Sequence, residues 1–127
     1  MKIGIVGLPQ SGKTTLFNAL TGSEIDTAAF TGGKMEAHHA IVHVPDERVE
    51  LLAEIFKPRK KTTATIEYID LAGLSGSEQK KGGFSDQFLG QIRTVDAVLV
   101  TLRAFKDENI AHPLLSIDPV RDLGIIN

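Results

Sequence analysis

Residues 7–14 read Gly-Leu-Pro-Gln-Ser-Gly-Lys-Thr, and this stretch decides the fold of the chain. It has the pattern of a phosphate-binding loop, in which two glycines bracket variable positions and are followed by Lys and Ser or Thr. The apolar residues 3–6 before the loop read as a buried strand, and the residues after it read as a helix. This strand-loop-helix order is the context that the motif requires. The sequence therefore predicts binding of nucleotide phosphates, whereas a plain glycine-rich turn would leave the Lys-Thr pair unexplained.

Each residue type in the loop suits a dense negative charge. Glycines let the main chain approach closely, and successive N–H groups converge on one point with the N-terminus of the following helix. Lys13 would reach the β- and γ-phosphates and act catalytically by stabilising charge, while the Thr14 hydroxyl would bind Mg²⁺. The predicted nucleotide-binding residues are Gly7, Leu8, Pro9, Gln10, Ser11, Gly12, Lys13, Thr14 and Thr15.

Composition limits the classes of protein that fit. The 127 residues suffice for about one small domain, and a hydrophobic content of 42% is enough for a single core. A net charge of −2 gives no overall attraction for nucleic acid or an anionic membrane. The chain has no cysteine, which excludes disulfides and thiolate metal sites and suits a reducing compartment. No apolar run approaches the about 20 residues of a membrane helix, and the first strand leaves no room for a signal sequence. We expect a cytoplasmic protein that binds neither membrane nor DNA.

Strand and helix patterns alternate along the chain. Strands are expected at residues 3–6, 40–44, 65–71 and 97–102, and helices at 14–20, between Asp46 and Pro58, and at 85–94. Apolar strands separated by helices predict an α/β fold with a mostly parallel sheet covered on both faces. The expected architecture is a three-layer P-loop NTPase of the Ras-like type. Residues 107–127 fit it less well, so we expect the sheet to be incomplete and the chain to be part of a longer protein.

A second group of candidate residues follows the strand expected at 65–71. Asp70 begins the segment Asp-Leu-Ala-Gly, in which the Asp can hold the Mg²⁺ shell and the amide of Gly73 can meet a γ-phosphate. Thr31, in the loop after the first helix, is the candidate that closes over Mg²⁺ and γ-phosphate, with Thr27 close by. We predict a catalytic role for Gly73 and Thr31 and a metal role for Thr31 and Asp70. The alternative is that Asp70 only caps a turn.

Together these residues resemble the nucleotide-binding domain of the YchF type, in the Obg group of translation-factor-class P-loop proteins. The resemblance covers nearly the whole chain and is carried by residues 1–22, 44–58, 66–74, 95–100, 107–112 and 118–122. It implies that residues 1–127 are the N-terminal portion of that domain, without the coiled-coil arm and the TGS domain. It also implies a nucleoside triphosphatase that uses Mg²⁺, prefers ATP with GTP as the alternative, and associates with the ribosome.

The chain departs from the resembled family at three places. Gln10 and Ser11 stand where the family usually has Asn and Val. In related proteins the Asn helps to hold a monovalent cation, so the resemblance does not carry a prediction of stimulation by potassium. The segment around Thr31 aligns only with a gap. Residues 75–83 replace a more regular Lys-Gly pattern.

The residue that would orient water for hydrolysis is not evident from the sequence. Leu74 occupies the position at which Ras-like proteins have a water-positioning Gln, so intrinsic turnover should be slow. The alternative is a regulatory module that binds nucleotide with negligible turnover, and a small-molecule kinase is a less favoured third reading. The resemblance implies that the segment which selects adenine or guanine lies beyond residue 127.

Two other clusters have ordinary explanations. His38, His39 and His43 match no established metal spacing. The basic run 57–61 could contact ribosomal RNA, but a solvated turn explains it equally well.

Overall fold

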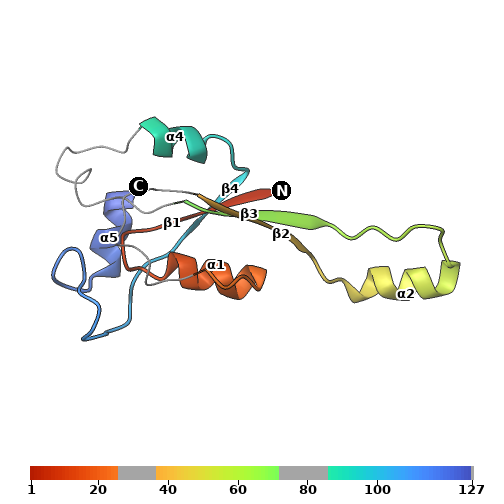
Figure 1. The fold of residues 1–127 in the computed structure, drawn as a ribbon, viewed down its shortest axis with the longest axis horizontal. Helices are drawn as coiled ribbons and strands as arrows, with labels where there is room; N and C mark the ends of the chain where they lie inside the picture. Colours follow the sequence, from red (N-terminus) through yellow and green to blue (C-terminus); the bar gives the residue numbers. More distant parts are fainter. Residues whose placement is uncertain (26–36, 72–85, 127) are drawn as a thin grey trace.

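The computed structural model describes residues 1–25, 37–71 and 86–126. Its centre is a four-stranded sheet in the order β2-β3-β1-β4. The strands are β1 (Lys2–Val6), β2 (His38–His43), β3 (Thr65–Asp70) and β4 (Ala97–Val100). β1 pairs in parallel with both β3 and β4, whereas β2 runs antiparallel to β3. The prediction of a mostly parallel α/β sheet is confirmed (Figure 1).

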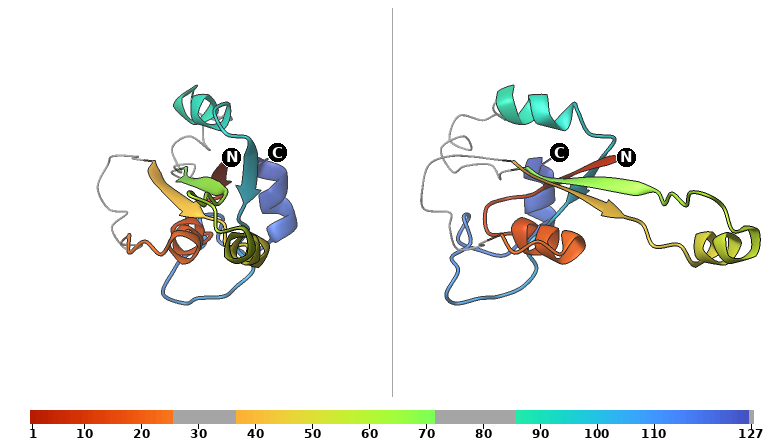
Figure 2. Two further views of the ribbon diagram at one scale, coloured as in Figure 1. Left: turned by 90° about the vertical axis from the view of Figure 1, so that its right-hand side faces the viewer. Right: turned by 45° about the vertical axis from the view of Figure 1, so that its right-hand side comes forward.

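The helices α1 (Lys13–Thr21) and α4 (Asp86–Ile92) lie on opposite sides of this sheet (Figures 1 and 2). Successive residues of a strand point to opposite faces, so a strand covered on both faces must be apolar throughout. Ile5 of β1 and Phe17 of α1 are fully buried, and Val6 belongs to a core cluster that includes Phe88 of α4. These contacts fix the end of β1, from which the candidate loop starts.

The helix α5 (Pro119–Ile126) falls in the segment that the sequence pattern left unassigned. Asp118 accepts a hydrogen bond from the Arg121 backbone N at 3.0 Å, and Pro119 occupies the first helical position. An Asp cap followed by Pro is a recognised start signal, because the cap satisfies a free N–H and the ring fixes a helical φ. Ile126 packs against the core cluster, so α5 belongs to the folded body.

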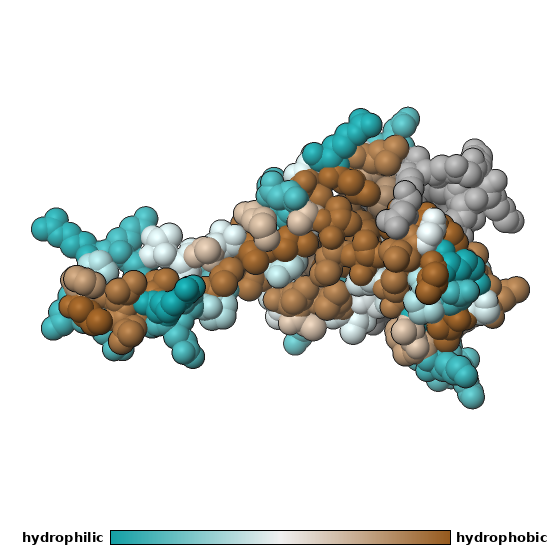
Figure 3. All heavy atoms as spheres, turned by 180° about the vertical axis from the view of Figure 1, so that it is seen from behind, coloured by the Kyte–Doolittle hydropathy of each residue, from teal (hydrophilic) through white to brown (hydrophobic). Residues whose placement is uncertain are grey.

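The helix α2 (Glu47–Phe56) stands away from the sheet at the end of an arm (Figure 1). Its predicted cap is confirmed, since Asp46 accepts from the Arg48 backbone N at 3.0 Å. No residue of α2 is buried, and its large apolar side chains are exposed (Figure 3). The helix therefore covers neither face of the sheet, although its apolar spacing is typical of a helix that packs on one. These exposed side chains are Leu51, Leu52, Ile55 and Phe56.

The ends of several elements differ from the expected ones by one or two residues, as is usual for strand and helix termini. β2 begins at His38, two residues early, and β4 ends at Val100, two residues short. Among the helices that the structure describes, each is too short or too polar to cross a lipid bilayer.

Two phenylalanines test which helix stabilises the body. Phe17→Ala should lower the free energy of unfolding by about 3–5 kcal/mol, because it leaves a cavity at a fully buried site. Phe56→Ala, at a side chain that is 73% exposed, should change it by less than about 0.5 kcal/mol. Chemical denaturation of the natural full-length protein measures both. A large loss from Phe56→Ala would contradict the exposed position of α2.

Candidate functional site

The loop between β1 and α1 makes a tight turn whose backbone geometry explains one of its glycines. Gly12 has φ 92° and Gln10 has φ 62°, both in the left-handed region. Glycine reaches this region without steric cost, so Gly12 suits the residue that starts α1. The Ser11 backbone N donates to Leu8 O at 3.3 Å, and the Leu16 N donates to Gly12 O at 2.9 Å. The loop is thus closed on itself and continuous with the first turn of α1.

Gly7 is required for a different reason, because the chain passes close to the residue that follows β4. A Cβ at Gly7 would lie 2.5 Å from both Thr101 O and Thr101 Oγ1, and 2.6 Å from Ser11 Oγ. A Cβ atom does not approach another heavy atom so closely, and backbone atoms cannot move aside easily. Any side chain at Gly7 would therefore push the loop away from β4.

Lys13 is the first residue of α1 and is buried, with 7% of its surface exposed. Its Nζ donates a hydrogen bond to Leu8 O at 3.0 Å, so the side chain folds back over the loop. Burial lowers the pKa of Lys13 from its ordinary value, and the charge of Asp70 acts in the opposite direction. The hydrogen-bond partner of the amine is a neutral carbonyl, so a bound anion would further favour the charged form of Lys13.

Thr14 and Asp70 meet at the edge of the sheet where β1 and β3 end. The parallel register places Ile5 of β1 opposite Asp70, so the carboxyl ends of β1 and β3 reach the same edge. The Thr14 hydroxyl donates to Asp70 Oδ2 at 2.7 Å. Asp70 is only 4% exposed, and its Oδ1 has no hydrogen-bond partner in the described part of the chain. An orphaned buried carboxylate oxygen is costly, so it points to a further group at this position.

These two oxygens suit a magnesium ion better than a metal held by protein ligands alone. Hydroxyl and carboxylate oxygens are hard ligands of the kind that Mg²⁺ prefers, and Mg²⁺ usually keeps waters and substrate phosphates in its shell. Over residues 1–25, 37–71 and 86–126, no group of three or more His, Asp or Glu side chains could hold a metal ion. The site thus fits an ion whose other ligands come from a phosphate and from water.

Some of the predicted site residues can be placed and others cannot. The structure brings together the loop 7–12, Lys13, Thr14 and Asp70, while Thr15 lies on α1 as an exposed residue. Thr31 and Gly73 lie outside the described residues, as does Leu74. Their roles stay predictions.

A buried polar network that the sequence did not predict joins His112 to Asp122. His112 Nδ1 accepts from the Leu114 backbone N at 3.1 Å, so the neutral ring carries its proton on Nε2. Nε2 then donates to Asp122 Oδ2 at 3.0 Å. Leu114 packs against the core cluster that contains Leu8, which connects this network to the phosphate loop.

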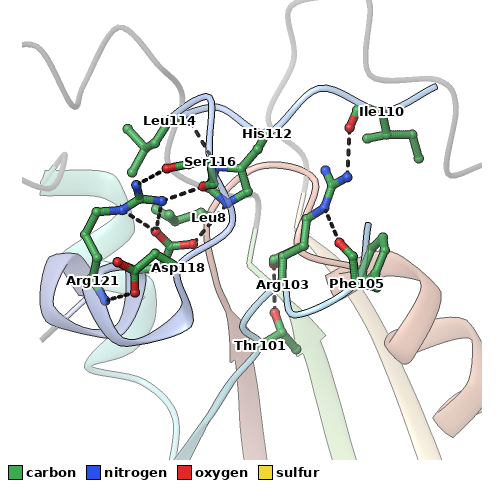
Figure 4. A network of polar contacts seen from close by, with 12 residues as sticks. Leu8, Thr101, Arg103, Phe105, Ile110, His112, Leu114, Ser116, Asp118 and Arg121 are labelled. Atoms are coloured by element: carbon green, nitrogen blue, oxygen red, sulfur yellow. Dashed lines mark hydrogen bonds and ion pairs between the residues drawn. The ribbon is translucent and has the colours of Figure 1, made fainter. Parts of the chain in front are cut away.

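Arginine side chains tie the rest of this segment together, as Figure 4 shows for Arg121 and Arg103. Arg121 donates twice to Asp122 Oδ1, at 3.0 and 2.8 Å, and also to Ser116. Arg103 is buried and donates to the backbone oxygen of Ile110 at 2.8 Å. The Asp-Pro start of α5 could have indicated this helix, but not the polar contacts that it makes.

Comparison with known proteins agrees with the geometry. A family model described as 50S ribosome-binding GTPase matches residues 2–122. The ribosome-binding ATPase YchF of Escherichia coli O157:H7 is 42% identical over 126 residues, covering 99% of this chain and 35% of that protein. Obg-like ATPase 1 of Oryza sativa subsp. indica is 42% identical over 126 residues, covering 99% of this chain and 32% of that protein.

The solved structure of the Schizosaccharomyces pombe YchF GTPase has a TM-score of 0.64 and 36% identity. It aligns with 99% of this chain and 34% of that one. The chain thus spans about a third of the length of the curated relatives that it matches, 35% in the Escherichia coli case.

The lowered pKa of Lys13 predicts a pH dependence of phosphate binding. An anionic phosphate favours the charged amine, so phosphate binding should raise the pKa of Lys13 again. At pH values above the lowered pKa of the free protein, Lys13 should therefore take up a proton when phosphate binds. Affinity for a nucleoside diphosphate should therefore fall as the pH rises through that value, below the 10.5 of an ordinary lysine. Calorimetric titration in two buffers of different ionisation enthalpy measures the uptake. Constant affinity up to the pH at which exposed lysines titrate would contradict the prediction.

Proposed function

Because this chain belongs to the family of 50S ribosome-binding GTPases and is of the YchF type, we propose that it binds a nucleoside triphosphate with Mg²⁺ and hydrolyses it slowly. The observation that carries the proposal is the meeting of Lys13, Thr14 and Asp70 at one edge of the sheet. A buried cation and two oxygen ligands beside a closed loop are the parts that phosphoryl transfer requires.

The chain's own groups would act by position and charge. Lys13 would exchange Leu8 O for the β- and γ-phosphate oxygens and stabilise the charge that develops on them. Loop N–H groups and the start of α1 would hold the phosphates in one orientation. Thr14 and Asp70 would hold Mg²⁺, which when bound neutralises phosphate charge. Leu74 has no polar atom with which to orient the attacking water, so we expect slow turnover.

Thr31 and Gly73 are proposed as the residues that respond to the γ-phosphate. A threonine that closes over the ion and a glycine amide that meets the phosphate form the two contacts that hydrolysis releases in switch proteins. Their positions in the sequence, between the first helix and β2 and just after β3, support this role. Both remain proposals, since both lie outside the described residues.

A regulatory module that binds nucleotide with negligible turnover is the second candidate. It is favoured by Leu74, which has no polar atom with which to orient an attacking water. The two candidates share the binding site and differ only in the chemical step. Phosphate release measured over many turnovers separates them.

The proposed nucleotide is ATP, with GTP as the alternative. Relatives named YchF and Obg-like are described as ATPases, whereas the family model and the Schizosaccharomyces pombe structure are described as GTPases. The relatives described as ribosome-binding support a role as a switch linked to the ribosome, and hence to the cytoplasm. Because the chain covers about a third of these relatives, this partner is proposed for the whole protein.

Removing the buried cation should strongly weaken phosphate binding. Lys13→Ala should weaken binding of Mg²⁺-ATP or Mg²⁺-GTP by about 30-fold to 1,000-fold, the worth of charge-assisted hydrogen bonds at a desolvated site. The matched control is Lys57→Ala, an exposed lysine that follows α2, which should bind as the unaltered protein does. Calorimetric titration of the natural full-length protein measures affinity, and phosphate release measures turnover. Equal binding by both variants would contradict the proposed site.

The metal role of Asp70 is tested separately. Asp70→Asn keeps an oxygen that can accept from Thr14 but removes the charge that would hold Mg²⁺. We expect nucleotide affinity to lose most of its dependence on Mg²⁺ concentration while affinity without the metal changes little. An unaltered dependence on Mg²⁺ in the variant would mean that Asp70 only caps the end of β3.

A further inference from the structure

Two hydroxyl groups join the phosphate-binding loop to the end of β4. Ser11 Oγ lies 3.0 Å from Thr101 Oγ1, across 90 positions of sequence. Ser11 is buried, with 7% of its surface exposed, and Thr101 directly follows β4. The contact is distinct from the hydrogen bond of Lys13 to Leu8 O and from that of Thr14 to Asp70 at the end of β3.

The direction of these hydrogen bonds follows from the proton count. Thr101 Oγ1 donates to Val6 O at 3.0 Å, and a carbonyl oxygen can only accept. The single proton of Thr101 is therefore used, so the Ser11 hydroxyl must donate to Thr101 Oγ1. The Thr101 backbone N also donates to Val6 O, at 2.8 Å. Thr101 thus holds the residue before the loop and the residue near its end at the same time.

The same pair of hydroxyls, together with the Thr101 backbone oxygen, leaves no room for a side chain at Gly7. A Cβ at Gly7 would collide with Thr101 Oγ1 and with Ser11 Oγ, at 2.5 and 2.6 Å. The hydroxyl pair therefore packs directly on the Gly7 backbone. The loop is held from β4 while its residues Gln10 and Gly12 keep their left-handed backbone.

We propose that Thr101 is a positioning residue which, through Ser11, holds the free phosphate loop in the conformation that accepts phosphate. The inference rests on the proposed nucleotide binding. Thr101 touches no phosphate in this scheme and acts only by raising the fraction of free protein whose loop is ready to bind. Once phosphate is bound, its own hydrogen bonds hold the loop, so the Ser11–Thr101 contact matters less in the complex.

This role has a kinetic signature. If a substitution lowers the fraction of competent free protein, apparent affinity falls by that fraction, and the loss appears in the association rate. The dissociation rate stays unchanged, because the bound loop is held by phosphate. Substitution of a residue that merely stabilises the fold would instead lower the unfolding temperature, without a selective fall in the association rate.

The test is stopped-flow binding of a fluorescent nucleoside diphosphate with Mg²⁺ to the natural full-length protein. Thr101→Val removes the hydroxyl that accepts from Ser11 and donates to Val6 O, so it should lower the association rate by about tenfold or more, the worth of one to two hydrogen bonds, and leave the dissociation rate within about twofold. Ser11→Ala removes only the bond to Thr101 and should lower the association rate by up to about tenfold, and it carries the test if Thr101→Val does not fold. Thr101→Ser keeps the hydroxyl and should restore the rate. Thr94→Val is the matched control, because its hydroxyl donates to Gln91 O on the exposed surface.

The double variant Ser11→Ala with Thr101→Val sharpens the test. Thr101→Val alone leaves the buried Ser11 hydroxyl without an acceptor, whereas the double variant leaves no such group, so the two losses should not add. Unchanged association rates in Thr101→Val and Ser11→Ala would overturn the inference while leaving the nucleotide site intact. An equal fall in the association rate of the control Thr94→Val would also overturn it. Failure of the unaltered protein to bind nucleotide would overturn the proposed function as well.

Discussion

The parallel pairing of β1 with β3 is the constraint on which the site depends. It sets Ile5 opposite Asp70, so two segments far apart in sequence end at one edge of the sheet. The loop and α1 begin at that edge, and the Thr14 hydroxyl then reaches Asp70 at 2.7 Å. A register shift of one residue would turn the Asp70 side chain to the opposite face and separate the two groups. Burial of Ile5 and Ile69 opposes such a shift, because either side chain would leave the core.

The electrostatics of the site are those of a place prepared for a ligand rather than of a finished core. Lys13 is buried with a carbonyl as its hydrogen-bond partner, and one oxygen of Asp70 has no partner in the described part of the chain. Either feature alone would lower stability, because charged groups lose their hydration on burial. A nucleotide phosphate and a divalent cation would satisfy both together. Strain and incomplete pairing of this kind are typical of binding sites, which trade some stability for affinity.

Local rules account for the parts of the molecule that the sequence predicted. The loop motif and Asp70 follow from residue types at fixed spacing, and the parallel strands that unite them follow from apolar runs separated by helices. The pairing of His112 with Asp122 could not be predicted, because a long-range contact between two polar side chains leaves no periodic signal. The exposed position of α2 was equally hidden: amphipathic spacing indicates a helix but not which surface covers it. Only α5 had an unused local signal, in the Asp cap and the proline that follows it.

The most direct measurement is a crystal structure of the natural full-length protein with Mg²⁺ and a non-hydrolysable nucleoside triphosphate. We expect Lys13 Nζ to leave Leu8 O, which lies 3.0 Å away here, and to bind the β- and γ-phosphates. We also expect the ion to lie beside Thr14 Oγ1 and Asp70. A nucleotide bound elsewhere, with Lys13 still on Leu8 O and Thr14 still on Asp70, would contradict the proposed site.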